Sequence, residues 1–179
     1  MLEKKNEVKN FNRYYELRNK VDTLVARLSK QHHQHMACKK GCDLCCMDFS
    51  IFPIEFYSIR EALATKNLSQ TSPGTNTDSS CIFLKDHACT IYNERPIICR
   101  THGLPLLYMN DNSEWELSAC ELNFTAFDMD DFSSENTFPQ DKFNSELFIL
   151  NKAFIAQMPE NKFGEFDLIP LKQLLTDTL

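Results

Sequence analysis

The chain has 179 residues, which is enough for one domain with a substantial core. A hydrophobic share of 42% with 14 Phe is typical of a folded globular protein. The formal net charge of −6 argues against a general nucleic-acid binder and against docking on anionic membranes, since both need a basic surface. We therefore expect one domain over residues 1–179, with no nucleic-acid and no membrane partner and with an unknown protein partner.

The N-terminus and the cysteine count together indicate a cytoplasmic protein. The first residues, MLEKKNEVKNFNRYYELRNK, lack the apolar core and the cleavage site of a signal peptide. No apolar run approaches the roughly 18 residues of a membrane span. In a reducing compartment, eight cysteines are better explained as metal ligands or reactive thiols than as four disulfides.

Residues 1–35 predict a long N-terminal amphipathic helix. Between Phe11 and Leu28, apolar residues recur at spacings of three and four with charged residues between them, so we expect helix from about residue 5 to residue 30. The histidines of QHHQH follow, and we expect them to be solvated. Residues 36–125 form the predicted cysteine-cluster core, which opens with CKKGCDLCC, where Gly41 permits a sharp turn.

The middle of the chain predicts short elements around the cysteines. Pro53 suits the first turn of a second helix, and the polar residues 67–80 predict a surface loop. CIFLKDHACTIY (residues 81–92) predicts a small β-hairpin that turns at Asp86–His87. YNERPIICRTHG then predicts a helical turn, and SEWELSACELNF a short strand.

Residues 126–179 predict an acidic loop followed by C-terminal helices. FDMDDFSSENTFPQD is acidic and irregular, which is typical of a linker loop. Apolar residues between Phe143 and Phe154 recur at helical spacing, so we expect an amphipathic helix that ends near Pro159. A last short helix is predicted over PLKQLLTDTL. The predicted fold class is mainly α with a cysteine-rich, loop-dominated metal-binding centre and a short β-hairpin.

The cysteines are spaced like the ligands of a metal. Thiolates two or three residues apart on a tight turn can face one metal, and both Zn²⁺ and iron–sulfur clusters commonly take four of them. Neighbouring side chains rarely point at one centre, so we expect the adjacent Cys45 and Cys46 to do different jobs. One of them ligates, while the other ligates a second ion or packs in the core. The predicted metal ligands are Cys38, Cys42, Cys45, Cys46, Cys81, Cys89, Cys99 and Cys120.

Three further side chains near the cysteines are predicted to assist the metal. Positive charge stabilises a thiolate site, so Arg95 and Arg100, which flank Cys99, are predicted to support the bound thiolates. His102, three residues after Cys99, is a candidate extra ligand. No Ser/His/Asp set, P-loop or dinucleotide fingerprint occurs in the sequence, so no catalytic residue is predicted.

These motifs resemble the YkgJ-like bacterial cysteine-cluster family, a zinc- or iron-chelating domain with a CxxxCxxCC start. The resemblance is close over residues 38–100 and extends to Cys120. The matching positions are Cys38, Cys42, Cys45, Cys46, Glu55, Cys81, Phe83, Leu84, Cys89, Ile91, Tyr92, Arg95, Pro96, Cys99 and Arg100. The resemblance implies zinc or an iron–sulfur cluster as cofactor. A related cluster occurs in a flagellin lysine methylase, where an iron–sulfur cluster is implicated.

Three functions therefore stay open. The first is a cytosolic metal-binding protein that holds zinc or an iron–sulfur cluster through these cysteines. The second is an iron–sulfur enzyme acting with S-adenosylmethionine, because Cys38, Cys42 and Cys45 match the ligand spacing of radical enzymes that use this molecule. The third is a structural zinc module that serves as an adaptor. The residues alone choose neither zinc nor iron, and neither one site nor two.

Overall fold

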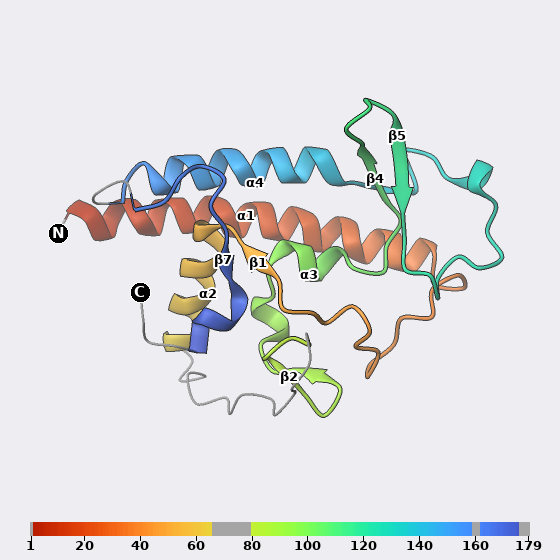
Figure 1. Ribbon diagram of the computed structural model, residues 1–179, viewed down its shortest axis with the longest axis horizontal. Helices are drawn as coiled ribbons and strands as arrows, with labels where there is room; N and C mark the ends of the chain where they lie inside the picture. Colours follow the sequence, from red (N-terminus) through yellow and green to blue (C-terminus); the bar gives the residue numbers. More distant parts are fainter. Residues whose placement is uncertain (1, 66–79, 159–161, 176–179) are drawn as a thin grey trace.

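The computed structural model describes residues 2–65, 80–158 and 162–175 of the chain (Figure 1). Its α-helices are α1 (Leu2–Gln31), α2 (Pro53–Thr65), α3 (Ile97–Thr101) and α4 (Gln140–Ile155). Its strands are β1 (Ser50–Ile51), β2 (Leu84–Lys85), β3 (Ala88–Cys89), β4 (Leu106–Met109), β5 (Trp115–Ser118), β6 (Phe138–Pro139) and β7 (Ile169–Pro170). Single 3-10 turns occur at Tyr92–Glu94, Met129–Asp131 and Leu171–Leu175. The expectation of a mainly α protein is confirmed for this part of the chain.

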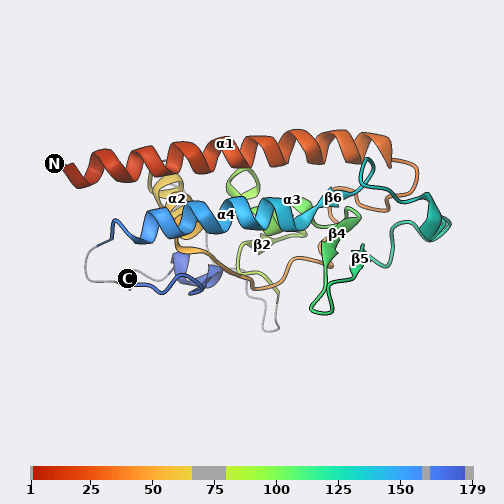
Figure 2. The ribbon, with the colours of Figure 1, turned by 90° about the horizontal axis from the view of Figure 1, so that it is seen from above.

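Helices α1 and α4 lie side by side and form the upper layer of the molecule (Figures 1 and 2). The predicted apolar face of α1 is confirmed, since Tyr14, Val21 and Leu28, which are seven residues apart, are fully buried. Phe11 of α1 contacts Phe154 of α4, with ring centroids 5.5 Å apart. The predicted helix after Phe143 therefore exists and packs as its periodicity indicates, but it ends at Ile155.

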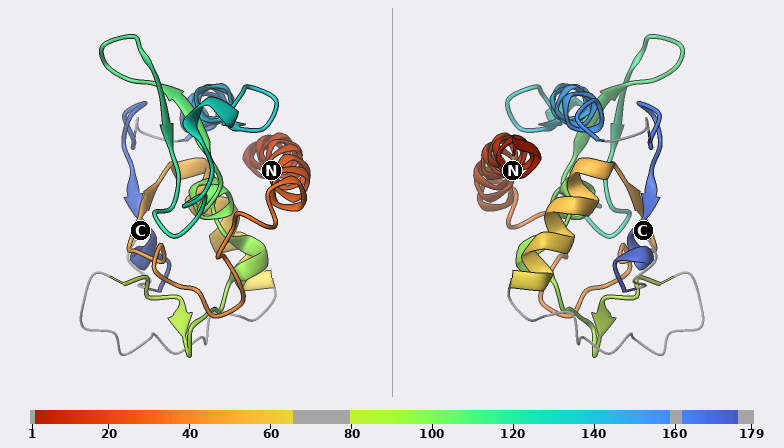
Figure 3. Two further views of the ribbon diagram at one scale, coloured as in Figure 1. Left: turned by 90° about the vertical axis from the view of Figure 1, so that its right-hand side faces the viewer. Right: turned by 90° about the vertical axis from the view of Figure 1, so that its left-hand side faces the viewer.

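A second apolar cluster lies below this pair of helices. It contains residues from α2, the β2–β3 hairpin and the C-terminal segment, and its fully buried members include Phe56, Ile59 and Phe83. Figure 3, which views α1 and α4 along their axes, shows α2 and the hairpin extending away from both helices. Cys81 belongs to this cluster, and Cys46 and Cys89 pack against it. One of the eight cysteines is therefore built into this core, and two more border it.

The predicted hairpin at residues 81–92 is confirmed. Leu84 pairs with Cys89 and Lys85 with Ala88, and the two turn residues Asp86 and His87 both have positive φ (49° and 60°). Positive φ at both turn positions matches the right-handed twist of two short strands. This hairpin carries Cys89 back toward the segment that begins at Cys81.

Two small sheets join parts of the chain that are far apart in sequence. In the first, β4 pairs antiparallel with β5 and parallel with β6. In the second, β1 pairs with β7, with Ser50 opposite Pro170. The strand predicted within SEWELSACELNF is β5, whereas β4, β6 and the β1–β7 pair were not predicted. The predicted last helix is a 3-10 turn over its described residues, and the predicted loop at 67–80 lies almost wholly outside the described residues.

A buried carboxylate joins three helices next to the cysteine region. Glu55, near the start of α2, accepts hydrogen bonds at Oε1 from the Tyr14 hydroxyl of α1 (3.3 Å) and from the Ile97 N–H of α3 (2.8 Å). Burial raises the pKa of Glu55 to about 7, against the hydrogen bonds from Ile97 and Tyr14 and the charge of Arg100, which lower it. Because α3 carries Cys99, this carboxylate also fixes the position of that cysteine.

Candidate metal centre

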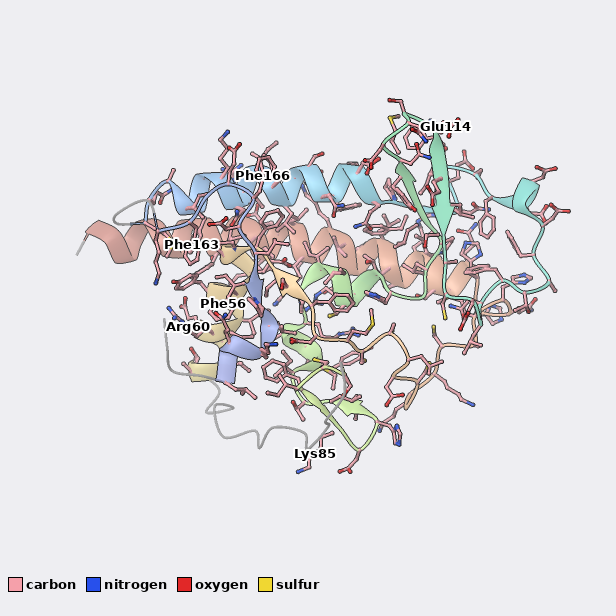
Figure 4. All side chains as sticks on the ribbon, in the orientation of Figure 1. Phe56, Arg60, Lys85, Glu114, Phe163 and Phe166 are labelled. Atoms are coloured by element: carbon pink, nitrogen blue, oxygen red, sulfur yellow. The ribbon has the colours of Figure 1, made fainter. Side chains whose placement is uncertain are left out.

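The segment CKKGCDLCC runs as consecutive turns between α1 and β1. The Cys42 N–H donates to the Lys39 carbonyl (3.0 Å), and the Cys46 N–H donates to the Asp43 carbonyl (2.8 Å). Gly41 has φ +92°, the left-handed conformation that its place in the motif predicts. Figure 4 shows sulfur atoms, in yellow, among the loops below α1 and α3.

Three thiols, those of Cys46, Cys81 and Cys89, lie at the second core cluster, and we call them together with Cys99 the inner set. The Cys81 N–H donates to the Cys46 carbonyl (2.9 Å), which holds the two segments together. The pKa of Cys99 is raised to about 12 by burial and then by the nearby charges of Cys81 and Cys89. The inner set thus brings together CKKGCDLCC, the hairpin and α3.

The charges of three other thiols act on that of Cys38, and we call Cys38, Cys42, Cys45 and Cys120 the outer set. Burial raises the pKa of Cys38, and the charges of Cys120, Cys42 and Cys45 raise it further. The residue Cys38 is exposed, whereas the other three are half-buried. The outer set therefore joins CKKGCDLCC to the segment after β5.

Asn123 joins Cys38 to the segment that carries Cys120, and sequence reasoning did not find it. Its Nδ2 donates to Cys38 Sγ (3.3 Å) and to the Gly103 carbonyl (2.7 Å), while its backbone N–H donates to the Cys120 carbonyl (2.8 Å). Its Oδ1 accepts from the Ala37 N–H (2.7 Å). Only the three-dimensional fold brings Asn123 to Cys38, so no local sequence signal marks it.

Gly103 gives Cys38 the room that it needs. Its φ is +89°, and a Cβ atom at this position would lie only 2.6 Å from Cys38 Sγ. The helical turn predicted over YNERPIICRTHG ends at Gly103, and α3 does end just before it, at Thr101. The missing side chain therefore allows both the backbone turn and the close approach of a thiol.

Cys45 and Cys46 are adjacent in sequence but have different neighbours. The Cys45 thiol donates a hydrogen bond to Cys46, which raises the pKa of Cys45 and lowers that of Cys46. Burial and the charges of Cys81, Cys89 and Cys99 oppose this lowering at Cys46. The charge of Cys45 also raises the pKa of Cys38. The pair thus stands at the boundary between the two sets.

The cysteine thiols are not arranged as the complete ligand shell of a metal ion. All eight cysteines are free. Within residues 2–65, 80–158 and 162–175, no three His, Cys, Asp or Glu side chains are close enough together to hold one metal ion. The donor set nevertheless fits the expected group, because four soft thiolates are the usual ligands of structural Zn²⁺ and of iron–sulfur clusters.

Arg95 and Arg100 have different surroundings. Arg95 Nη1 donates to the Cys99 carbonyl (3.4 Å), and its charge lowers the pKa of Cys45, Cys89 and Cys99. Arg100 is buried and instead binds Asp22 of α1 (2.7 Å) and the carbonyl oxygens of Asn93 and Arg95. The predicted support of bound thiolates by each arginine stays a prediction.

The histidines near the cysteines have partners of their own. His102 Nδ1 is hydrogen-bonded to the Ile98 carbonyl, and its ring packs against Phe49 at 5.1 Å, so its role as a ligand also stays a prediction. The expectation of solvated histidines in QHHQH is wrong for His32, which is buried and contacts the Phe124 ring at 5.1 Å. The acidic loop predicted as a linker also carries aromatic residues, which cover the end of α1.

Comparison with known proteins agrees with the resemblance that the sequence suggests. Residues 37–121 match the family model CxxCxxCC, described as a putative zinc- or iron-chelating domain. No curated protein and no solved structure matches the chain. None of the described helices combines the length and the apolar character needed to cross a bilayer. The matched range contains all eight cysteines together with Arg95, Arg100 and His102. Over residues 37–121, the chain is thus similar to the CxxCxxCC domains, which are described as zinc- or iron-chelating.

Proposed function

We propose that this protein is a cytoplasmic metal-binding protein whose eight cysteines hold zinc or an iron–sulfur cluster. One observation carries the proposal: free thiols from four separate segments of the chain meet in one region. In a reducing compartment such a gathering is unexplained by disulfides and is explained by a bound metal. The family match over residues 37–121 supports the same chemistry.

The residues of the chain have distinct parts in holding the metal. The thiolates supply soft ligands, and the two turns of CKKGCDLCC keep several of them within one short loop. Asn123 donates to Cys38 Sγ and orients that side chain. Arg95 adds a positive charge next to Cys89 and Cys99, which favours their ionised form. When bound, the metal would cross-link these segments.

The core location of the inner set favours a structural or storage role for the metal over an enzymatic one. Cys81 is buried in the second apolar cluster, and Cys46 and Cys89 pack against it. Structural zinc sites are closed in this way, whereas catalytic sites keep a position open. A structural zinc module is therefore our second candidate, and the enzyme acting with S-adenosylmethionine is the third.

Anaerobic purification followed by elemental analysis, sulfide analysis and an absorption spectrum tests the proposal. We expect zinc or iron in whole-number ratio to the chain. Iron with sulfide and a broad band near roughly 400 nm indicates a cluster, whereas zinc without visible absorption indicates thiolate sites. Metal-free protein with an unchanged thermal midpoint would refute the proposal. Binding and cleavage of S-adenosylmethionine by an iron-loaded sample would revive the enzyme candidate.

A further inference from the structure

Strand β5 has one side that no strand covers. In its three-stranded sheet, β4 lies between β5 and β6, so β5 is an edge strand. Within the part of the chain that the structure describes, no strand pairs with the other side of β5. Figure 1 shows the β4–β5 hairpin projecting beyond α4. An edge of this kind is a template for a strand from another chain.

The register of the hairpin shows which backbone groups face this edge. The Asn110 N–H donates to the Glu114 carbonyl (2.9 Å), so these two residues form a hydrogen-bonded pair. Bonded and non-bonded pairs alternate in an antiparallel ladder, which places Trp115 and Leu117 in non-bonded pairs. Met109, opposite Trp115, accordingly turns its N–H away from β5, to a carboxylate at the start of α4 (2.7 Å). The N–H and C=O groups of Trp115 and Leu117 therefore point away from β4, toward the open edge.

The same two residues place apolar side chains on one face of the sheet. Side chains alternate along a strand, so Trp115 and Leu117 share a face and Glu116 lies on the opposite one. Trp115 is 66% exposed. Together with Phe132 of the loop before β6, both side chains line a cavity of about 640 Å³, and Lys142 of α4 also lines it. A strand added to β5 would place every second side chain on this largely apolar face.

The surface around the edge is strongly acidic. Residues 101–141 contain no lysine and no arginine, and their carboxylates are all exposed except for that of Asp141, which is half-buried. These carboxylates belong to Asp111, Glu114, Glu116, Glu121, Asp128, Asp130, Asp131, Glu135 and Asp141. Figure 4 places Glu114 at the end of the hairpin. Such a surface repels nucleic acids, anionic membranes and a second copy of the same edge, and it attracts a basic segment.

We propose that β5 binds an extended, basic segment of a partner protein as an added antiparallel strand. Antiparallel pairs are the more stable per residue. The segment's residues opposite Trp115 and Leu117 exchange backbone hydrogen bonds with them and carry apolar side chains on the cavity face. The residues between these carry lysine or arginine on the face of Glu116. Main-chain pairing supplies the affinity and the alternate side chains the specificity. This interaction goes beyond metal binding and uses no cysteine.

The chain's one tryptophan, Trp115, reports directly on this edge. The probe is the synthetic peptide KVKVKVK, acetylated and amidated, which contains no aromatic residue. We expect its titration into the intact protein to shift Trp115 emission to shorter wavelength, because an added strand excludes water from the indole. EVEVEVE, with the same alternation and the opposite charge, is the matched control and should cause no shift. Added salt should weaken the binding of KVKVKVK.

Two N-methylated forms of the peptide test the strand pairing without changing the protein. In antiparallel addition, the valines lie opposite Trp115 and Leu117 and turn their N–H groups toward β5, whereas the lysine N–H groups point away. N-methylation of the central valine should therefore weaken binding about tenfold, since it removes one hydrogen bond and places a methyl group between the strands. N-methylation of the next lysine is the matched control and should change binding little.

The substitution Leu117→Pro makes the converse change in the protein. It removes an outward N–H from β5 but none that bonds β4, and proline is tolerated on edge strands. We expect it to weaken binding of KVKVKVK about tenfold, with metal content and circular dichroism unchanged.

Several results would overturn the proposal. These are no emission shift with KVKVKVK, equal binding of EVEVEVE, or a greater loss on methylation of the lysine than of the valine. Emission from Trp115 that changes with protein concentration alone would identify a second copy as the occupant and would also refute it. The peptide titration measures no metal, so its failure would leave the proposed metal binding untouched.

Discussion

The buried carboxylate of Glu55 makes the stability of the fold depend on pH in a definite direction. A pKa of about 7, against the usual 4.5, means that the folded protein holds this proton more tightly than the unfolded chain does. The free energy of unfolding is therefore expected to fall as the pH rises from about 4.5 to about 7, and to be level above that range. The difference corresponds to about 3 kcal/mol.

The substitution Glu55→Gln isolates this effect. Glutamine is neutral at every pH and keeps an oxygen that can accept the Ile97 N–H, so it mimics the protonated acid. We expect the free energy of unfolding of the variant, minus that of the wild type, to increase by about 3 kcal/mol between pH 4.5 and pH 8. Urea unfolding at matched pH values measures it. All other side chains are the same in both proteins, so their contributions cancel in the difference.

The result that would refute this reasoning is a difference that is flat or changes in the opposite direction. Four groups favour the ionised form of the carboxylate, and they are the Tyr14 hydroxyl, the backbone N–H groups of Ile97 and Phe52, and the Arg100 guanidinium. An opposite trend would mean that their combined effect exceeds the cost of burial. Glu55 would then act as a buried anion that locks α2 to α3.

Three further outcomes are expected. Gly103→Ala places a Cβ atom 2.6 Å from Cys38 Sγ at a positive φ, so it should lower both the metal content and the stability of the protein. The left-handed backbone alone costs about 1–2 kcal/mol. Gly41→Ala, which is also at positive φ but has open space around it, is the matched control and should change stability without displacing a thiol. Arg100→Lys keeps the charge but loses the fork that reaches a carboxylate and two carbonyls, so urea unfolding should show a loss of about 1.5–3 kcal/mol. A chelator that removes the metal should lower the thermal midpoint of unfolding, because the metal cross-links separate segments of the chain; an unchanged midpoint would contradict this role.

The sequence predicted the elements whose signals are local. The heptad-like burial in α1 and the apolar spacing after Phe143 follow from helical periodicity alone. The β2–β3 hairpin follows from the turn residues Asp86–His87, which tolerate positive φ better than β-branched residues do. In each case the deciding residues lie within one or two turns of one another.

The features that the sequence did not predict all depend on distant residues. β1 pairs with β7 through Ser50 and Pro170, which are far apart along the chain, and no spacing rule connects them. Asn123 reaches Cys38 in the same way. The burial of His32 depends on aromatic residues in a loop whose acidic composition indicates only solvent exposure. Such contacts are specified by the packing of the whole fold.

The adjacent cysteines show how the local and the distant contributions combine. The spacing in CKKGCDLCC already implies that Cys45 and Cys46 differ, because neighbouring side chains rarely converge on one ion. The contacts of each one are decided elsewhere in the chain: the Cys46 carbonyl accepts a hydrogen bond from the Cys81 N–H, and the Cys45 carbonyl accepts one from the Met47 N–H. Because one peptide unit joins the two residues, a shift of that unit would move both thiols at once.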